Sequence, residues 1–446
     1  MSTRLKRICA LALVGAIALF AVACGGSNDD NGGGGGGSSG SSTAGTPDPA
    51  DVSGKIVVWD VFYRSFPSYT RAVPELDAAF KKKYPNVTVE HVAQPFAEYQ
   101  ALQQAAFTGR EGPDVMMMPN AGGIRQFQKG LEELNDRITP EMQEQLTGWD
   151  AVTPGYRTEG PHYGVPIAQT DFMFYFNKRL FRRAGLPTDF EPRTWEDLRD
   201  AGLKLKAAGI QPFTGGNKEG YESQWWWHMA WPTYNTQEQA VALADGELPF
   251  TDPAVAQTFE PEMMMQRAGL FERDRFTTPF FNDGWMRFAD GKAAMILGGS
   301  TNTAYWGDFN RALGEENVGM FLPPGSKYIS MNPEWSWSIP KFAENKDAAW
   351  AYIDFMASRE GLEMLFEMTG ELPNRKDAEL PADAPSQARQ IRDWYRDGPT
   401  FLATDVLTPS QVTQTMNTEA KEWLQGRKSK EEMLESIQAT SEQVNR

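Results

Sequence analysis

The chain has 446 residues, a formal net charge of −16 at pH 7, two cysteines and three histidines. So acidic a chain is a poor partner for nucleic acid or for an anionic membrane surface. The histidines (His91, His162 and His228) are far apart, so no His/Cys cluster has metal-ligand spacing, and we expect no metal and no other cofactor.

Residues 1–23 are typical of a secretory signal peptide. Arg4, Lys6 and Arg7 precede an apolar run over residues 8–22, and small residues follow. A transmembrane span needs about 20 apolar residues, so this run is too short for a comfortable one. We therefore favour a cleaved leader over a plain N-terminal membrane anchor, and expect the protein to be exported.

Cys24 lies where the apolar run meets a glycine–serine tract. The stretch from Ala21 to Gly25 resembles a bacterial lipobox, although Leu is usual where Ala21 stands. The resemblance implies cleavage before Cys24 and acylation of its thiol. Several acyl chains give stable anchoring where one would be marginal. Residues 24–53, rich in Gly and Ser, are then a lipidated tether to the cell membrane that cannot order itself.

From Gly54 onward, 393 residues remain, which suggests two compact units more than one core. Apolar runs over residues 55–62, 87–93 and 113–119 predict strands, and the segments between them predict helices. This alternation points to α/β layers with parallel strands. Met116, Met117 and Met118 are then core residues.

A second series of such segments follows over residues 163–181, 194–209 and 288–300. Thr194, with Asp197 three residues later, predicts a capped helix start. The tail, residues 409–444, has charged and apolar residues at helical spacing.

Signatures of catalysis are few. No phosphate loop and no Gly-x-Ser-x-Gly elbow appears, although the many Asp and Glu residues leave a glycosidase-type carboxylate pair open. Aromatic residues are conspicuous, with Trp225, Trp226 and Trp227 in "YESQWWWHMAW" and Trp335 and Trp337 in "EWSWSIPK". They pack in the core, or they stack on the apolar faces of sugars.

In chain order, "KIVVWDVF", "GPDVMMMP", "YGVPIAQTDFMFYFNKRLF", "FADGKAAMILGGS" and "WSWSIPKFAENKDAAWAYIDFM" resemble motifs of the family-1 extracellular solute-binding proteins of ABC importers, typified by maltose-binding protein. The resemblance covers residues 55–444. It implies an α/β fold with two discontinuous lobes, residues 54–168 plus 326–373 and residues 169–325 plus 374–446. The chain would cross between them near residues 168–171 and 322–328 and after Pro373, with a hinged cleft between the lobes.

The resemblance also implies a set of ligand-binding residues at the cleft. Thr170 stands where maltose-binding protein has an acidic contact, which Asp171 beside it would supply. Among the tryptophans, Trp227 is the first choice for the cleft and Trp335 the second, with Trp337 on the same strand face. The full set is Phe62, Tyr63, Arg64, Asn120, Thr170, Asp171, Glu222, Trp227, Ser300, Thr301, Asn302, Trp335 and Trp337.

The expected function is that of a substrate-binding lipoprotein. It would act as a monomer, capture a carbohydrate, most simply an oligosaccharide, and deliver it to the permease subunits of an ABC importer without covalent chemistry. Two alternatives stay open. A secreted glycosidase would need two cleft carboxylates about 5–9.5 Å apart. A ligand sensor would hand its closed form to a signalling partner instead.

Overall fold

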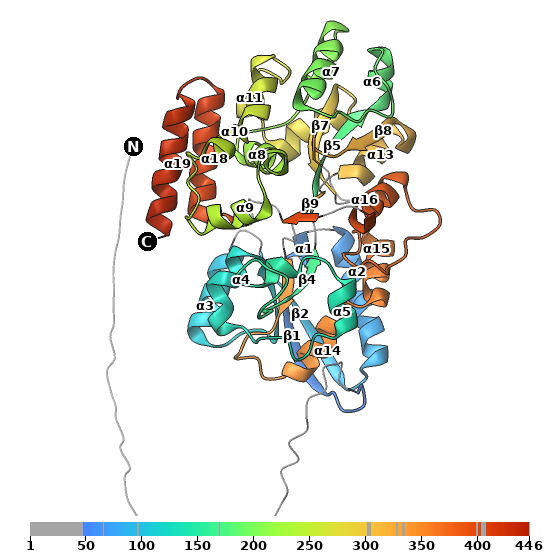
Figure 1. Ribbon diagram of the computed structural model, residues 1–446. Coiled ribbons are helices and arrows are strands. Elements are labelled where there is room, and N and C mark those ends of the chain that lie inside the picture. The colour runs from blue at the N-terminus through green and yellow to red at the C-terminus, as the bar shows by residue number, and fades with distance from the viewer. Residues whose placement is uncertain are drawn as a thin grey trace, which may run out of the picture. The chain divides into compact units, whose positions relative to one another are not determined.

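The computed structural model describes residues 48–65, 67–95, 98–168, 170–300, 305–326, 329–331, 335–397, 400–402 and 407–445, which belong to one compact unit. Cys24, Thr301 and Asn302 lie outside these ranges. Within them, two β-sheets organise the chain (Figure 1). No helix of these ranges has the length and apolar character needed to cross a membrane.

The first sheet has five strands in the order β2-β1-β3-β10-β4. β1 is parallel to β2 and β3, whereas β10 is antiparallel to β3 and β4. Because β10 comes late in the chain, its place between β3 and β4 makes the first sheet discontinuous in sequence. Its strands are β1 (Gly54–Asp60), β2 (Val87–Ala93), β3 (Val115–Pro119), β4 (Val165–Ala168) and β10 (Trp335–Ser338).

The second sheet has the order β11-β9-β5-β7-β6, and β8 also pairs with β5. β6 is parallel to β7 and β9 to β11, whereas β5 is antiparallel to β7, β8 and β9. Both sheets are thus mixed, not purely parallel. The strands are β5 (Phe172–Asn177), β6 (Gln211–Phe213), β7 (Ala293–Gly299), β8 (Val318–Phe321), β9 (Ile329–Met331) and β11 (Thr400–Leu402).

Helices accompany each sheet, and a sheet together with its helices is called a lobe below. The helices of the first series are α1 (Phe62–Ser65), α2 (Pro67–Lys83), α3 (Tyr99–Gly109), α4 (Gly122–Phe127), α5 (Pro140–Gln145), α14 (Lys346–Met356) and α15 (Arg359–Thr369). Those of the second are α6 (Lys178–Arg183), α7 (Trp195–Ala207), α8 (Tyr221–Tyr234), α9 (Gln237–Ala244), α10 (Pro253–Gln257), α11 (Glu260–Arg267), α12 (Trp285–Ala289), α13 (Gly307–Leu313), α16 (Ser386–Asp397), α18 (Ser410–Leu424) and α19 (Lys430–Val444).

Local signals in the sequence explain several of these elements. Thr194 caps α7, since its side chain accepts from the Asp197 N–H while the Asp197 carboxylate accepts from the Thr194 N–H, which confirms the predicted capping box. Ser429 begins α19 in the same way, within the tail predicted to be helical. The three methionines of β3 are at most 1% exposed, which confirms them as core residues.

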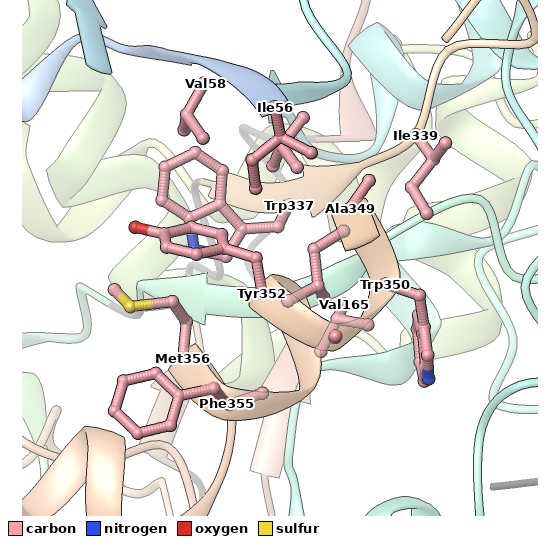
Figure 2. Close-up of a cluster of buried hydrophobic side chains, with 14 of the residues drawn as sticks. Ile56, Val58, Val165, Trp337, Ile339, Ala349, Trp350, Tyr352, Phe355 and Met356 are labelled. Carbon is pink, nitrogen blue, oxygen red and sulfur yellow. The ribbon is translucent and has the colours of Figure 1, made fainter. Parts of the chain in front are cut away.

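The core of the first lobe lies between its sheet and α14 (Figure 2). The Trp337 ring meets the Tyr352 ring edge to face, with centroids 6.4 Å apart, and Trp350 and Phe355 of α14 are fully buried. At 3% exposure, Trp337 is a core side chain of this lobe, not a surface for a ligand. Burying rings of this size accounts for much of the stabilisation of a lobe that has no disulfide in its described residues.

Short connections bring one edge of each sheet close to the other. In the first sheet, Pro119 and Ala168, which end β3 and β4, both lie opposite Trp335 at the start of β10. In the second sheet, Phe172 at the start of β5 lies opposite Gly299 at the end of β7. Three residues separate Ala168 from Phe172, so the chain between them extends at most about 14 Å. The name facing edges is used below for these two sheet ends. The first carries the ends of β3 and β4 and the start of β10, and the second carries the start of β5 and the end of β7.

The lobe limits given by the resemblance remain a prediction, and two details of the pairing bear on them. β9 pairs in the second sheet, although the expected limits place residues 326–373 in the first lobe. Asn374 still bonds to the first lobe, donating from Nδ2 to the Pro166 carbonyl at 2.9 Å. β4 and β5 are thus consecutive strands in different sheets, as are β9 and β10, and the chain still bonds to the first lobe at Lys376, whose N–H donates to the Gln145 carbonyl at 2.8 Å.

Candidate functional site

The first facing edge carries an aromatic pair from two predicted site residues. The Asp60 carboxylate ends β1 and accepts from the N–H groups of Phe62, at 2.6 Å, and Tyr63, at 3.2 Å, which begins the short helix α1. The half-buried Phe62 ring meets the Trp335 ring edge to face, with centroids 5.9 Å apart. Residues about 270 positions apart thus form one aromatic contact, in which Phe62 is half-buried and Trp335 is 9% exposed, next to Tyr63 and Arg64 of α1.

Asn120 follows β3 on the same edge and is 6% exposed. Ala121 after it has φ +50° and ψ −101°, a region that residues with a side chain rarely adopt. Its N–H donates to the Ala151 carbonyl at 2.7 Å, which holds this turn in place. Backbone strain of this kind is kept where the surroundings fix it and is common at binding sites.

Thr170, Asp171 and Ser300 meet at the second facing edge. The Asp171 N–H donates to the Ser300 hydroxyl at 3.0 Å, although the two residues were predicted from separate motifs. Asp171 is fully buried and Thr170 half-buried. A Cβ at Gly299 would lie 2.9 Å from the Thr170 methyl group and from the Tyr305 ring, so the end of β7 needs glycine for these side chains to approach.

Trp225, which the sequence analysis did not select, is the half-buried member of the tryptophan run. Its ring contacts those of Tyr221 and Phe280, with centroids 4.8 and 4.9 Å away, and that of Phe172 at the edge, 4.9 Å away. Phe281 is 45% exposed and packs on Trp225 and Tyr221, each at 6.2 Å between centroids. Tyr221, Trp225 and Phe281 are called the aromatic shelf below.

Trp227 lies in the core instead. It is 1% exposed, and its ring packs on those of Trp231, Phe250 and Phe259, with centroids 5.3, 6.2 and 5.8 Å away. Two positions along a helix differ by about 200° in direction, so Trp225 and Trp227 of α8 must point to different sides. Tyr221 and Trp225 are four residues apart on α8 and therefore lie on the same side of the helix. This spacing was the signal in the sequence for the side of α8 that carries the shelf.

Glu222 belongs to a buried ion triad and not to an exposed surface. Its Oε2 accepts from Arg275 Nε at 3.0 Å, and the same guanidinium donates to Glu262. Ser223 donates to Glu262 Oε1 at 2.9 Å. All three charged side chains are at most 5% exposed, and burial raises the pKa of Glu262 while the Arg275 charge opposes this. The triad therefore offers no carboxylate pair to a substrate.

One ion pair joins the two lobes. Arg125 follows β3 in the first lobe, and Asp245 follows α9 in the second. Arg125 donates to Asp245 Oδ1 at 2.6 Å, and its guanidinium lies over the Tyr156 ring, 5.1 Å from the ring centroid. In the part of the chain that the structure describes, no three His, Cys, Asp or Glu side chains gather as metal ligands would.

The proteins that this chain resembles are described as binding proteins. The profile of a family described as "Bacterial extracellular solute-binding protein" matches residues 65–363. An sn-glycerol-3-phosphate-binding periplasmic protein, UgpB of Shigella flexneri, is 26% identical over 229 residues, which are 48% of this chain and 49% of that protein. A putative binding protein of Brucella abortus (strain 2308) is 22% identical over 69% of this chain and 73% of its own. The chain spans about half the length of the curated relatives that it matches first.

Solved structures share the fold. A chitin oligosaccharide binding protein superposes with a TM-score of 0.74 at 22% identity, covering 88% of this chain and 99% of its own. RafE from Streptococcus pneumoniae superposes with a TM-score of 0.70 at 16% identity, covering 91% and 100%. At these identities the likeness concerns the fold, which is two-lobed and α/β as expected.

Proposed function

Because the chain belongs to the bacterial extracellular solute-binding protein family, we propose that it captures a carbohydrate between the facing edges and delivers it to the permease subunits of an ABC importer. It acts as a monomer, and its binding involves no covalent chemistry. The names of two solved structures with this fold, which mention chitin oligosaccharide and raffinose, support the ligand class.

The aromatic shelf is the observation that carries the proposal. Sugars have an apolar C–H face that matches an aromatic ring, while their hydroxyl groups need polar partners. The shelf offers an exposed Phe281 and a half-buried Trp225, joined through Phe172 to the edge where Thr170 and Asp171 lie. On the other facing edge, the half-buried Phe62 ring, backed by the buried Trp335 ring, supplies a second aromatic surface. We keep Tyr63, Arg64, Asn120, Ser300, Thr301 and Asn302 as candidate polar contacts.

The two alternative functions gain no specific support. A glycosidase would need two carboxylates that a substrate can reach. Glu222 and Glu262 both pair with Arg275 in the buried triad, where a substrate has no access to them. A sensor would bind the same ligand, so only its partner distinguishes it from an importer component.

The test of the proposal is a binding screen followed by variants of the shelf. A thermal-shift panel should contain mono- and oligosaccharides together with sn-glycerol 3-phosphate. A ligand at 100 times its Kd stabilises the folded protein by about 2.7 kcal/mol. A shift with the phosphate ester and with none of the sugars would overturn the choice of carbohydrate.

For the sugar so found, Phe281→Ala and Trp225→Ala should each weaken binding by about 1–3 kcal/mol, because each removes a ring that stacks on the ligand. Titration calorimetry measures the change. Leu203→Ala is a matched control, since Leu203 is 41% exposed on α7, apart from the shelf. Phe281 is 45% exposed, so its truncation should cost the fold less than that of a buried ring. Unchanged affinity in both variants would show that the ligand does not use the shelf.

We also propose that Cys24 is acylated and anchors the protein outside the cytoplasm through the tether of residues 24–53, after removal of residues 1–23. The small-residue/cysteine junction supports this. Mass analysis of membrane-extracted protein should find an acylated N-terminal Cys24, and Cys24→Ala should release the protein or leave it as the uncleaved precursor. A mature chain that begins elsewhere without lipid would contradict the proposal.

A further inference from the structure

One contact between the lobes has no part in the proposed function so far. Arg125 of α4, in the first lobe, donates from Nη2 to Asp245 Oδ1 at 2.6 Å, and Asp245 directly follows α9 of the second lobe, which lies next to α4 in Figure 1. The same guanidinium lies over the Tyr156 ring and donates from Nη1 to the Tyr156 hydroxyl at 3.4 Å. Arg125, Tyr156 and Asp245 are called the lobe contact below.

Apolar packing accompanies this ion pair. Tyr156 is 4% exposed and belongs to the same apolar cluster as Leu243 and Ala244 of α9. Arg125 and Asp245 are more open to solvent, with side chains 42% and 31% exposed. Separating the lobes at this place would therefore break the ion pair and also bring the buried Tyr156 ring to solvent.

Two backbone outliers lie at the lobe contact. Among the described residues, three that are not glycine have a positive φ, and two of them are Ala121, at +50°, and Tyr156 itself, at +54°. The Tyr156 N–H donates to the Thr153 carbonyl at 3.2 Å, and the Thr153 hydroxyl accepts from the Arg157 N–H at 3.0 Å. Such conformations cost free energy, persist only where the surroundings impose them, and cluster at ligand clamps and switch regions. The strain is thus a second, independent indication that this contact has a function.

A single turn links the lobe contact to the candidate ligand site. Asn120, one of the candidate polar contacts, directly precedes Ala121, and the Ala121 carbonyl accepts from the Arg125 N–H at 2.9 Å. The bond from the Ala121 N–H to the Ala151 carbonyl therefore holds Asn120 and Arg125 through the same turn. The lobe contact borders the site, although none of its three residues is a candidate ligand contact.

An ion pair between two lobes acts differently from a pair within one lobe. An exposed pair contributes little to folding, because solvent screens it and two long side chains must be ordered. A pair between lobes exists only while the lobes touch, so all of its free energy favours the closed form over the open form. Hinged binding proteins open to release a ligand, so such a pair must break before the ligand leaves. The rate of release is therefore the quantity that the pair affects most directly.

We propose that Arg125, Tyr156 and Asp245 form a latch that holds the two lobes together, with and without ligand, and so slows the escape of a captured ligand. The inference rests on the proposed function, because the latch retains what the facing edges bind. The three residues act on the lobes and not on the sugar. Their effect should therefore fall mainly on the dissociation rate, where most affinity differences among variants of one site lie.

The first test measures the dissociation rate of the sugar found in the screen, by stopped-flow displacement, for wild type, Arg125→Glu, Asp245→Arg and the double variant with both changes. Each single change replaces an attraction by a repulsion that solvent screens only in part, so release should be about 5-fold faster or more. The double variant restores the pair with its charges exchanged, and release should return to within about 2-fold of wild type. A merely structural role of either residue would not give this rescue.

Arg137→Glu is the matched control. Arg137 donates to Asp347 Oδ1 at 2.7 Å and its side chain is 31% exposed, but both residues of this pair belong to the first lobe. Reversing its charge should leave the dissociation rate as in wild type. Wild-type release in both single variants of the latch, or no recovery in the double variant, would overturn the proposal.

A second readout needs no ligand, and therefore separates the latch from the proposed function. Small-angle scattering of the free protein should give a larger radius of gyration for Arg125→Glu than for wild type, because the lobes are then apart for more of the time. Arg137→Glu and the double variant should match wild type. An unchanged radius in Arg125→Glu would overturn the latch, even if sugars bind as proposed. A larger radius without binding of any sugar would support the latch and count against the ligand class instead.

Discussion

Replacing Arg275 by Leu is expected to lower the free energy of unfolding by about 3–5 kcal/mol, the usual effect of removing one partner of a buried ion pair. The substitution leaves the carboxylates of Glu222 and Glu262 together, 1% and 4% exposed, with no counter-charge. It also removes the contact of the guanidinium with the Phe271 ring, 3.8 Å from its centroid. Urea unfolding followed by circular dichroism measures the change.

Arg287→Leu is the matched control for this prediction. Arg287 donates to both carboxylate oxygens of Asp274, at 2.9 and 2.7 Å, and lies 3.8 Å from Glu272 Oε1. Its side chain is 26% exposed and that of Asp274 55%, so these pairs are nearer to solvent than the triad, and exposed pairs contribute about 0–1 kcal/mol. Adding Glu222→Gln and Glu262→Gln to the Arg275 variant should restore part of the loss, because the buried charges are then gone. If Arg275→Leu costs no more than Arg287→Leu, the triad does not contribute as described.

Trp227→Ala should cost about 3–5 kcal/mol of stability, as large-to-small changes in a packed core do. The Trp227 ring fills the space between Trp231, Phe250 and Phe259, so its removal leaves a cavity. At a temperature where the variant is folded, its Kd for the sugar should equal that of wild type. Thermal unfolding and calorimetry measure the two quantities.

Trp225→Ala is the variant to compare with Trp227→Ala. We expect Trp225→Ala to lose more affinity for the sugar and less stability than Trp227→Ala. The reverse result, with Trp227 controlling affinity, would restore the original choice of Trp227 for the cleft and contradict its assignment to the core.

The sequence predicted the fold well where one local signal decides the structure. The apolar run that contains Met116 to Met118 indicated a buried strand, and Thr194 with Asp197 indicated the start of a helix, and both signals lie within a few residues. The position of β10 in the first sheet has no such signal, because its pairing depends on strands more than 150 residues away.

The candidate site was harder to predict, for a geometric reason. Along a helix each residue turns by about 100°, so a match to a family stretch that is off by two positions selects the opposite side. Trp225 and Trp227 differ by such a step, and Trp225 is the half-buried one. Phe281 could not be found at all, because it is exposed by a π-helical turn over Phe280–Gly284, for which the sequence gives no pattern. Phe62 and Trp335 remain predicted ligand contacts, and the structure adds that their rings meet.

The insertion of β10 between β3 and β4 has a consequence for the order in which the chain can fold. Trp337 pairs with Met117 and Val165, so the first sheet lacks an inner strand until residues about 220 positions apart have met. A ribosome-bound chain that ends before Trp335 can form local helices and the β1–β2 pair, but not a closed core under α14. Contacts of such long sequence separation slow folding, because the loop must close before any pairing energy is gained. The first lobe therefore stays open until β10 and α14, which ends at Met356, have been made.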